Sequence, residues 1–198
     1  MARSEASREQ LESIRIGFSK CIKKAMAHVQ LDEGFLAFHE WALSADVPIV
    51  VLSGGLVPLI EATLERFIGG DMRGIQVVAN EVAVREGFES VDQDGGSWRV
   101  RFRDDTTYGH DKAQAIKLYA EDRERMEKNE MPILLFAGDG ISDLGAAGHS
   151  DLLFAKQGEG ACSLEPPWVS YLDCDLTALT RLCNRSYRVL STPPAAVF

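Results

Sequence analysis

The chain has 198 residues, a formal net charge of −9, and hydrophobic and charged shares of 45% and 26%. This length suits one core domain, alone or with a small cap, and the negative charge argues against nucleic acid as a partner. The sequence shows no signal peptide and no apolar stretch of membrane-spanning length, and its four cysteines have no Cys-x-x-Cys spacing. We therefore expect a cytoplasmic protein with reduced thiols and no membrane partner.

The N-terminal segment, residues 1–30, is predicted to form one long amphipathic helix over about residues 7–29. Its apolar residues recur at helical spacing. They are Leu11, Ile14, Phe18, Cys21, Ile22, Ala25 and Val29. A turn at residues 32–34 then leads into a short helix predicted over residues 35–44.

A short apolar strand is predicted over residues 48–52, and the run Ser53-Gly54-Gly55 follows it directly. A helix comes next, over residues 57–67, because apolar residues again follow helical spacing there. A hydroxyl group and glycine amides ahead of a helix N-terminus can bind a phosphate group. The same run can also form an ordinary tight turn, and both interpretations stay open at this point.

Alternating apolar and polar residues at 82–84 and 98–102 flank a run rich in glycine and aspartate at 92–96. This arrangement is typical of a β-hairpin, and a separate strand is predicted before it, over residues 74–78. We therefore expect a β-hairpin insertion over about residues 80–104.

A predicted apolar strand that begins at Leu134 leads into the turn residues Gly138-Asp139-Gly140, and Asp143 follows four residues after Asp139. Open α/β sheets bind ligands at the carboxyl ends of their parallel strands, and two convergent carboxylates favour a hard cation such as Mg²⁺. The alternative is a plain strand–turn–helix connection with Asp143 near a helix N-terminus. Upstream, Lys112 begins a helix predicted over residues 112–128, where a lone lysine is more often a solvated surface residue.

Further strands are predicted over residues 151–155 and 168–172, and a helix over residues 176–187. Residues 191–198, which include two adjacent prolines, are expected to form a loose tail. The expected organisation is thus an N-terminal helical segment, 1–30, an α/β core, 31–190, that carries the hairpin, and this tail.

Three segments, in this order and spacing, resemble the haloacid dehalogenase superfamily, nearest to its phosphoserine phosphatase-like branch. They are Val51-Leu52-Ser53-Gly54-Gly55, Gly109-His110-Asp111-Lys112 and Phe136-Ala137-Gly138-Asp139-Gly140-Ile141-Ser142-Asp143-Leu144-Gly145-Ala146-Ala147. The resemblance implies an α/β fold with a Rossmann-like parallel sheet flanked by helices. It also implies a Mg²⁺-dependent hydrolase whose partner is a small phosphorylated metabolite.

The resemblance further implies a role for each candidate residue. Ser53-Gly54-Gly55 would bind the substrate phosphate, and Lys112 would bind it too and act in catalysis. Asp139 would be a catalytic residue and a Mg²⁺ ligand, and Asp143 would belong to the metal site. Residues 1–30 would be a remnant of the family's helical cap.

The chain departs from the family pattern at its beginning. The family's nucleophile motif, Asp-x-Asp-x-Thr/Val, ends the first strand, which is central in the sheet, but residues 1–30 contain no aspartate. With that strand missing, we expect the gap to close, to be filled by another segment, or to pair in a homo-oligomer.

The same pattern occurs late in the chain, in Asp173-Cys174-Asp175-Leu176-Thr177. Both aspartates also suit the N-terminus of the helix predicted over residues 176–187, and we favour this role over a permuted nucleophile.

Three functions are compatible with these residues. The first is a phosphatase that hydrolyses a small phosphorylated metabolite, truncated and with activity lost or reduced, because covalent catalysis needs a nucleophile. The second is a non-catalytic pseudophosphatase that binds phosphate, another ligand or a protein partner. The third is a repurposed pocket for non-hydrolytic chemistry, with Asp139, Lys112 or His110 as acid or base.

Overall fold

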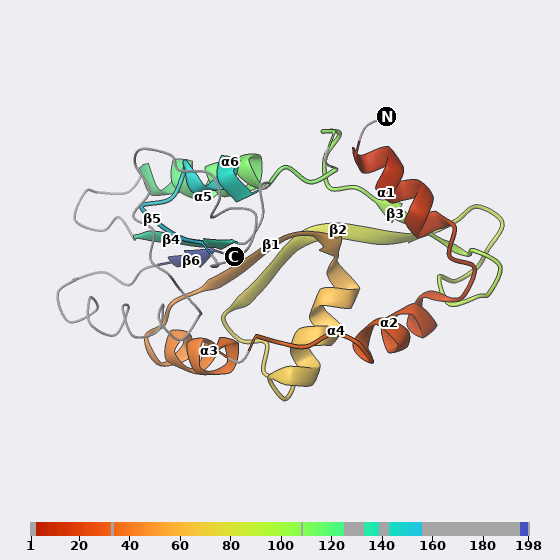
Figure 1. Ribbon diagram of the computed structural model, residues 1–198, viewed down its shortest axis with the longest axis horizontal. Helices are drawn as coiled ribbons and strands as arrows, with labels where there is room; N and C mark the ends of the chain where they lie inside the picture. Colours follow the sequence, from red (N-terminus) through yellow and green to blue (C-terminus); the bar gives the residue numbers. More distant parts are fainter. Residues whose placement is uncertain are drawn as a thin grey trace. The chain divides into compact units, whose positions relative to one another are not determined.

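The computed structural model describes residues 3–32, 34–107, 109–124, 133–138, 143–155 and 195–197. The chain forms two compact units, each assembled from segments that are far apart in sequence (Figure 1). The first unit combines residues 1–31, 53–72 and 77–111, and the second combines residues 32–52, 73–76 and 112–198. Strands β1 (Ile49–Leu56) and β2 (Ile75–Val84) contribute residues to both units.

In the first unit, β2 pairs antiparallel with β3 (Trp98–Arg101), and Val82 lies opposite Val100. The predicted hairpin is thereby confirmed. The strands expected separately at 74–78 and 82–84 are one continuous strand, because the residues between them also adopt extended backbone. The sequence pattern changes between residues 78 and 82, and this change predicts a break between two strands. It reflects only a change in side-chain burial along one strand.

The helices of the first unit are α1 (Arg3–Glu12), α2 (Phe18–Met26) and α4 (Val57–Phe67). They enclose a small apolar core in which the Phe18 and Trp98 rings meet edge to face, with centroids 5.2 Å apart. The indole Nε1 of Trp98 donates a hydrogen bond to the Ile16 carbonyl, so this buried tryptophan has its polar atom satisfied.

The prediction of a single N-terminal helix is wrong, because the helix is interrupted between α1 and α2. The hairpin loop supplies the hydrogen-bond acceptors that start α2. Asp94 accepts from the Gly17 amide at 2.9 Å, and Asp92 accepts from the Ser19 amide at 2.7 Å. Carboxylates at a helix N-terminus satisfy amides that have no partner within the helix. Helical periodicity cannot reveal a break that a distant loop imposes.

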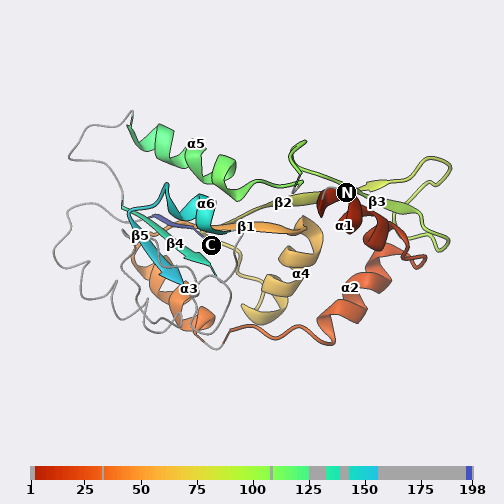
Figure 2. The ribbon, with the colours of Figure 1, turned by 45° about the horizontal axis from the view of Figure 1, so that its top comes forward.

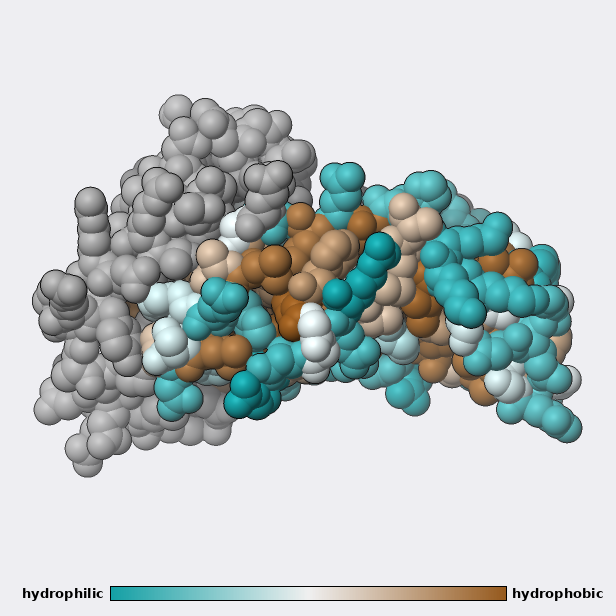
Figure 3. All heavy atoms as spheres, turned by 90° about the horizontal axis from the view of Figure 1, so that it is seen from below, coloured by the Kyte–Doolittle hydropathy of each residue, from teal (hydrophilic) through white to brown (hydrophobic). Residues whose placement is uncertain are grey.

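At the right of Figure 3, where α2 and the hairpin loop lie, hydrophilic residues predominate.

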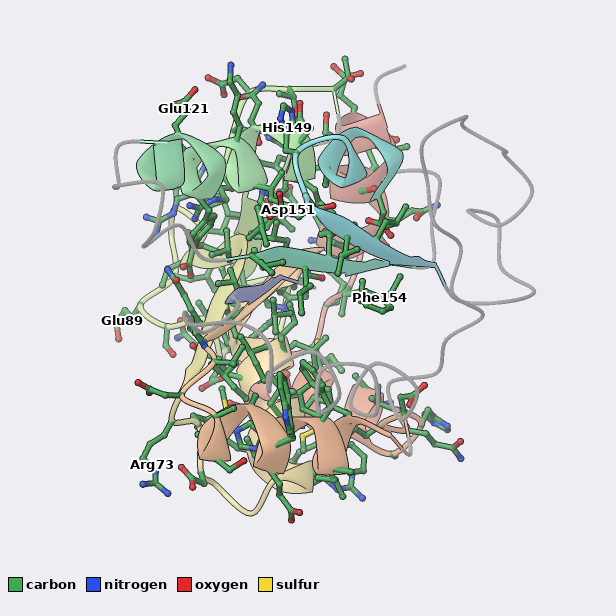
Figure 4. The ribbon with its side chains drawn as sticks, turned by 90° about the vertical axis from the view of Figure 1, so that its left-hand side faces the viewer. Arg73, Glu89, Glu121, His149, Asp151 and Phe154 are labelled. Carbon is green, nitrogen blue, oxygen red and sulfur yellow. The ribbon has the colours of Figure 1, made fainter. Side chains whose placement is uncertain are left out.

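The second unit is a parallel sheet with helices on both faces. Besides β1, its strands are β4 (Leu134–Gly138), β5 (Leu152–Ala155) and β6 (Ala195–Val197). They lie in the order β1-β6-β4-β5. Its helices are α3 (Phe35–Ser44), α5 (Lys112–Glu124) and α6 (Leu144–Ala147). Helices α5 and α6 cover one face and α3 covers the other (Figures 2 and 4). The α/β architecture expected from the sequence is therefore confirmed.

Apolar side chains fill the space between α3 and the sheet. Phe38 and Ile49 are almost completely buried, and Leu135 and Phe154 pack in the same cluster. Asp151 aligns the edge of the sheet, because its backbone amide and its carboxylate each form a hydrogen bond with Leu134. Figure 4 shows Asp151 and Phe154 at this edge.

The short strand β6 lies between β1 and β4 and is parallel to both. Ala196 is in register with Ile49 on one side and Leu135 on the other. Of the three arrangements expected for the central gap, the structure therefore has the one in which another segment fills it. Ala195–Val197 falls within the segment expected to be a loose tail, and this expectation is wrong for these residues, because the neighbouring strands supply backbone partners.

The segments predicted at 168–172 and 176–187, with Asp173 and Asp175, lie outside the described residues. No helix in the described ranges combines the length and the apolar character needed to cross a membrane.

Candidate functional site

Lys112 and Asp143 form a close ion pair in the second unit. The Lys112 Nζ atom lies 2.6 Å from Asp143 Oδ1, and the two side chains are only 20% and 5% exposed. Charged hydrogen bonds of this length are among the stronger ones in proteins, and partial burial reduces their screening by salt. The fold thus brings together two predicted site residues that are 31 positions apart in sequence.

Two glycines make room for this pair. A β-carbon on Gly138, the last residue of β4, would lie 2.6 Å from Asp143 Oδ2. A β-carbon on Gly145 would lie 3.2 Å from the Ala113 β-carbon, where α6 meets the first turn of α5. Close approach at these points lets Asp143 lie against the carboxyl end of β4 and reach Lys112.

The expected metal site is only partly described. Asp143 is a buried carboxylate at the end of a parallel strand, which is the ligand type that Mg²⁺ prefers. Its Oδ1 atom is bound to Lys112. Within the described ranges, no group of three or more His, Cys, Asp or Glu side chains could hold a metal ion. Asp139 lies outside the described residues, so its role stays a prediction.

The candidate phosphate-binding run lies in the first unit. The expectation that Ser53-Gly54-Gly55 forms a loop after the strand is wrong, because β1 continues through these residues to Leu56 and leads directly into α4. The Gly55 amide donates a hydrogen bond of 3.1 Å to Ser53 Oγ. Both glycines are exposed and Ser53 is half-buried, so these residues are accessible to a solute anion.

The residues before Lys112 form a compact loop around Asp104. Burial tends to raise the pKa of Asp104, but hydrogen bonds from the Thr106 side chain and the Asp111 and Thr106 amides, together with nearby His110, hold that pKa below its ordinary value. The Asp111 amide donates to Asp104 Oδ2 at 2.7 Å. The Asp104 carboxylate thus binds backbone amides at two points of this loop.

The sequence analysis did not identify Asn80, a residue of β2 that is 2% exposed. Its Nδ2 atom donates to the Gly54 carbonyl at 2.9 Å, and its Oδ1 atom accepts from the Arg103 amide at 3.0 Å. The sequence offers one sign that Asn80 has a special role, namely a polar residue directly after the apolar residues 77–79. Nothing local to that run indicates its partners.

The family and the relatives of the chain agree with the resemblance. Residues 1–148 match the model of a family described as haloacid dehalogenase-like hydrolase. A Saccharomyces cerevisiae protein named polyol phosphate phosphatase PYP1 is 39% identical over 154 residues, covering 76% of this chain and 61% of that protein. Schizosaccharomyces pombe Pdp3-interacting factor 1 is 31% identical over 155 residues, covering 78% of this chain and 62% of the relative.

A solved structure of a substrate-bound phosphoserine phosphatase complex shares the fold. The TM-score is 0.61 at 14% identity, over 92% of this chain and 78% of the other. The chain spans about three fifths of the length of the two curated relatives, 61% and 62%.

Proposed function

Because the chain belongs to the haloacid dehalogenase-like hydrolase family, we propose that it acts as a phosphatase on a small phosphorylated metabolite. The name of the yeast relative, a polyol phosphate phosphatase, makes polyol phosphates the first substrate class to test. The observation that carries the proposal is the ion pair between Lys112 and Asp143, at 2.6 Å and largely buried.

The ion pair suits Lys112 to bind a phosphate group. Asp143 holds the ammonium group in place, so less side-chain entropy is lost when a substrate binds. An ammonium group has three N–H donors, and the bond to Asp143 uses one. Lys112 can therefore donate to a phosphate oxygen while it stays paired with Asp143.

In the first unit, we assign the Ser53 hydroxyl as a candidate phosphate-binding group. Its oxygen accepts a hydrogen bond from the Gly55 amide, which leaves its O–H hydrogen to be donated. The exposed glycines that follow allow an anion to approach the backbone closely. Ser53 thus supplies a neutral hydrogen-bond donor suited to a phosphate oxygen.

Phosphatases of this family generally use Mg²⁺, and we propose Asp139 and Asp143 as its ligands. When bound, the ion would neutralise charge on the phosphate oxygens. Asp143 would then be a ligand of the ion as well as the partner of Lys112.

The proposal is tested by phosphate release from polyol phosphates and from p-nitrophenyl phosphate, with and without Mg²⁺, and by calorimetric titration with inorganic phosphate. Hydrogen bonds to charged groups contribute about 1.5–3 kcal/mol, so we expect Lys112→Met to weaken phosphate binding by ~10- to 100-fold. Lys117→Met is the matched control, because Lys117 lies in the same helix and is 58% exposed. Equal phosphate binding by both variants would contradict the proposal.

Lys112→Met leaves the Asp143 carboxylate buried without its cation, which can impair folding. The double variant Lys112→Met/Asp143→Asn removes both charges and provides a second test with a neutral site. Turnover in the wild type supports the phosphatase. Phosphate binding without turnover would instead support the phosphate-binding pseudophosphatase, which the same ligands serve equally well.

A further inference from the structure

We infer that Asn80 is a positioning residue for anion binding at Ser53, an inference that rests on the proposed function. The hydrogen bonds of the Asn80 side chain go to the Gly54 carbonyl and the Arg103 amide rather than to the Ser53 hydroxyl. Asn80 acts through the Gly54–Gly55 peptide, which connects its side chain to Ser53. Asn80, Arg103 and this run all belong to the first unit.

Three hydrogen bonds form a continuous chain. The Arg103 amide donates to Asn80 Oδ1 at 3.0 Å, and Asn80 Nδ2 donates to the Gly54 carbonyl at 2.9 Å. The Gly55 amide, which belongs to the same peptide group as that carbonyl, donates to Ser53 Oγ at 3.1 Å. The contacts thus run from the end of the hairpin to the candidate phosphate ligand.

Peptide planarity links the last two of these bonds. In a trans peptide the C=O and N–H groups point in opposite directions from one rigid plane, and the structure contains no cis peptide among its described residues. When Asn80 holds the Gly54 carbonyl on one side, the Gly55 amide must point to the other, towards Ser53. Glycines on both sides of this peptide would otherwise let the plane rotate.

The direction of the Ser53 hydroxyl follows from this arrangement. A hydroxyl oxygen can accept hydrogen bonds while it donates its single hydrogen. With the Gly55 amide bound to the oxygen, the hydroxyl hydrogen is available to a bound anion. Rotation of the peptide would instead present the Gly54 carbonyl to the anion, which repels it. Asn80 therefore decides whether this stretch of backbone favours or opposes phosphate.

The burial of Asn80 supports this role. A buried amide is costly unless its donor and acceptor both find partners, and Asn80 has a partner for each. An apolar side chain would fit the buried face of a strand at lower cost. We therefore attribute the polar residue at this position to the two backbone groups that it binds.

Asn80→Asp is the decisive variant. The aspartate keeps an oxygen to accept from the Arg103 amide but cannot donate to the Gly54 carbonyl, so it breaks the chain at one point. Ser97→Ala is the control, because Ser97 is fully buried in the same unit and its hydroxyl lies within hydrogen-bond distance of the Val91 and Gln93 carbonyls instead. Like Asn80→Asp, the Ser97→Ala variant loses a buried hydrogen bond and with it some stability. It changes no contact of residues 53–55.

The first readout is the hydrogen exchange and chemical shift of the Gly55 amide in the phosphate-free protein, measured by nuclear magnetic resonance. We expect Asn80→Asp to speed this exchange at least ~10-fold, and Ser97→Ala to leave it unchanged. The second readout is the affinity for inorganic phosphate, which we expect Asn80→Asp to weaken ~10-fold and Ser97→Ala to preserve. An Asn80→Leu variant, which lacks both contacts without added charge, should behave like Asn80→Asp.

An unchanged Gly55 amide in Asn80→Asp would overturn the inference, and so would equal losses of phosphate affinity in Asn80→Asp and Ser97→Ala. Failure of the proposed function is recognised separately. In that case the wild-type protein binds no phosphate, while the Gly55 amide still reports whether Asn80 holds the peptide.

Discussion

Gly138 lies so close to Asp143 that a β-carbon at position 138 would be 2.8 Å from both the β-carbon and the carboxyl carbon of Asp143. Carbon atoms that are not bonded keep about 3.5–4 Å apart. The last residue of β4 therefore determines where the Asp143 carboxylate lies, and through it the position of Lys112. The glycine is therefore required for the position of this ion pair.

Gly138→Ala should consequently displace Asp143 and weaken phosphate binding at least ~10-fold, with a loss of stability of about 1–3 kcal/mol from overpacking. Gly148→Ala is the control, because among the described residues the atom nearest to a β-carbon there would be the Gly145 carbonyl oxygen, at 3.8 Å. Phosphate titration and urea unfolding of both variants check this. Wild-type affinity in Gly138→Ala would show that Asp143 does not need its present position.

Asp143→Asn should destabilise the fold more than loss of an exposed ion pair does. Breaking a largely buried pair leaves a cation without its partner and costs up to about 3–5 kcal/mol, and some exposure of Lys112 reduces this to about 2–3 kcal/mol. Glu121→Gln breaks the exposed pair with Lys117 in the same helix, where we expect less than about 0.5 kcal/mol. The measurement is the free energy of unfolding in urea. Similar losses in the two variants would contradict a buried, structurally important pair.

Asp104 should give the loop before Lys112 an acid-sensitive stability. Its pKa in the folded protein is lowered, despite the opposing effect of burial, because the Thr106 side chain and backbone amides bind the ionised carboxylate. The resulting stabilisation is present above the ordinary aspartate pKa of about 4 and is lost as the pH falls through the lower pKa of the folded state. Unfolding measured between about pH 2 and pH 7 should show this loss in the wild type. Asp104→Asn should be less stable at neutral pH and should show a smaller dependence on acid.

Ala196→Pro should disrupt the parallel sheet of the second unit. Ala196 is paired on both sides in β6, and proline removes the backbone N–H that a central strand needs. We expect a loss of about 3 kcal/mol or more. Ala196→Val is the control, since it keeps the amide and has a high preference for strands. If both variants unfold at the same urea concentration as the wild type, the pairing of β6 contributes nothing to stability.

Local sequence patterns were sufficient for several elements. The helix predicted at 35–44 corresponds to α3, the helix at 57–67 to α4, and the apolar strand predicted from Leu134 onwards to β4. In each case one face of the element is buried, and particular residues mark where the element begins and ends. Both features can be read from residues that lie close together in the sequence. The same holds for the hairpin, whose alternation predicts two strands around a turn.

By itself, the sequence determined the family, the α/β class and the residue types available for phosphate chemistry, because these depend on short segments and their order. Only the tertiary structure decided where α2 begins, what lies between β1 and β4, which carboxylate holds Lys112, and that Asn80 holds the peptide after Ser53. Each of these depends on a backbone or side-chain partner far away in the chain. The physical reason is that a buried polar group must find a partner wherever the fold supplies one, and no periodicity in the surrounding residues records that choice.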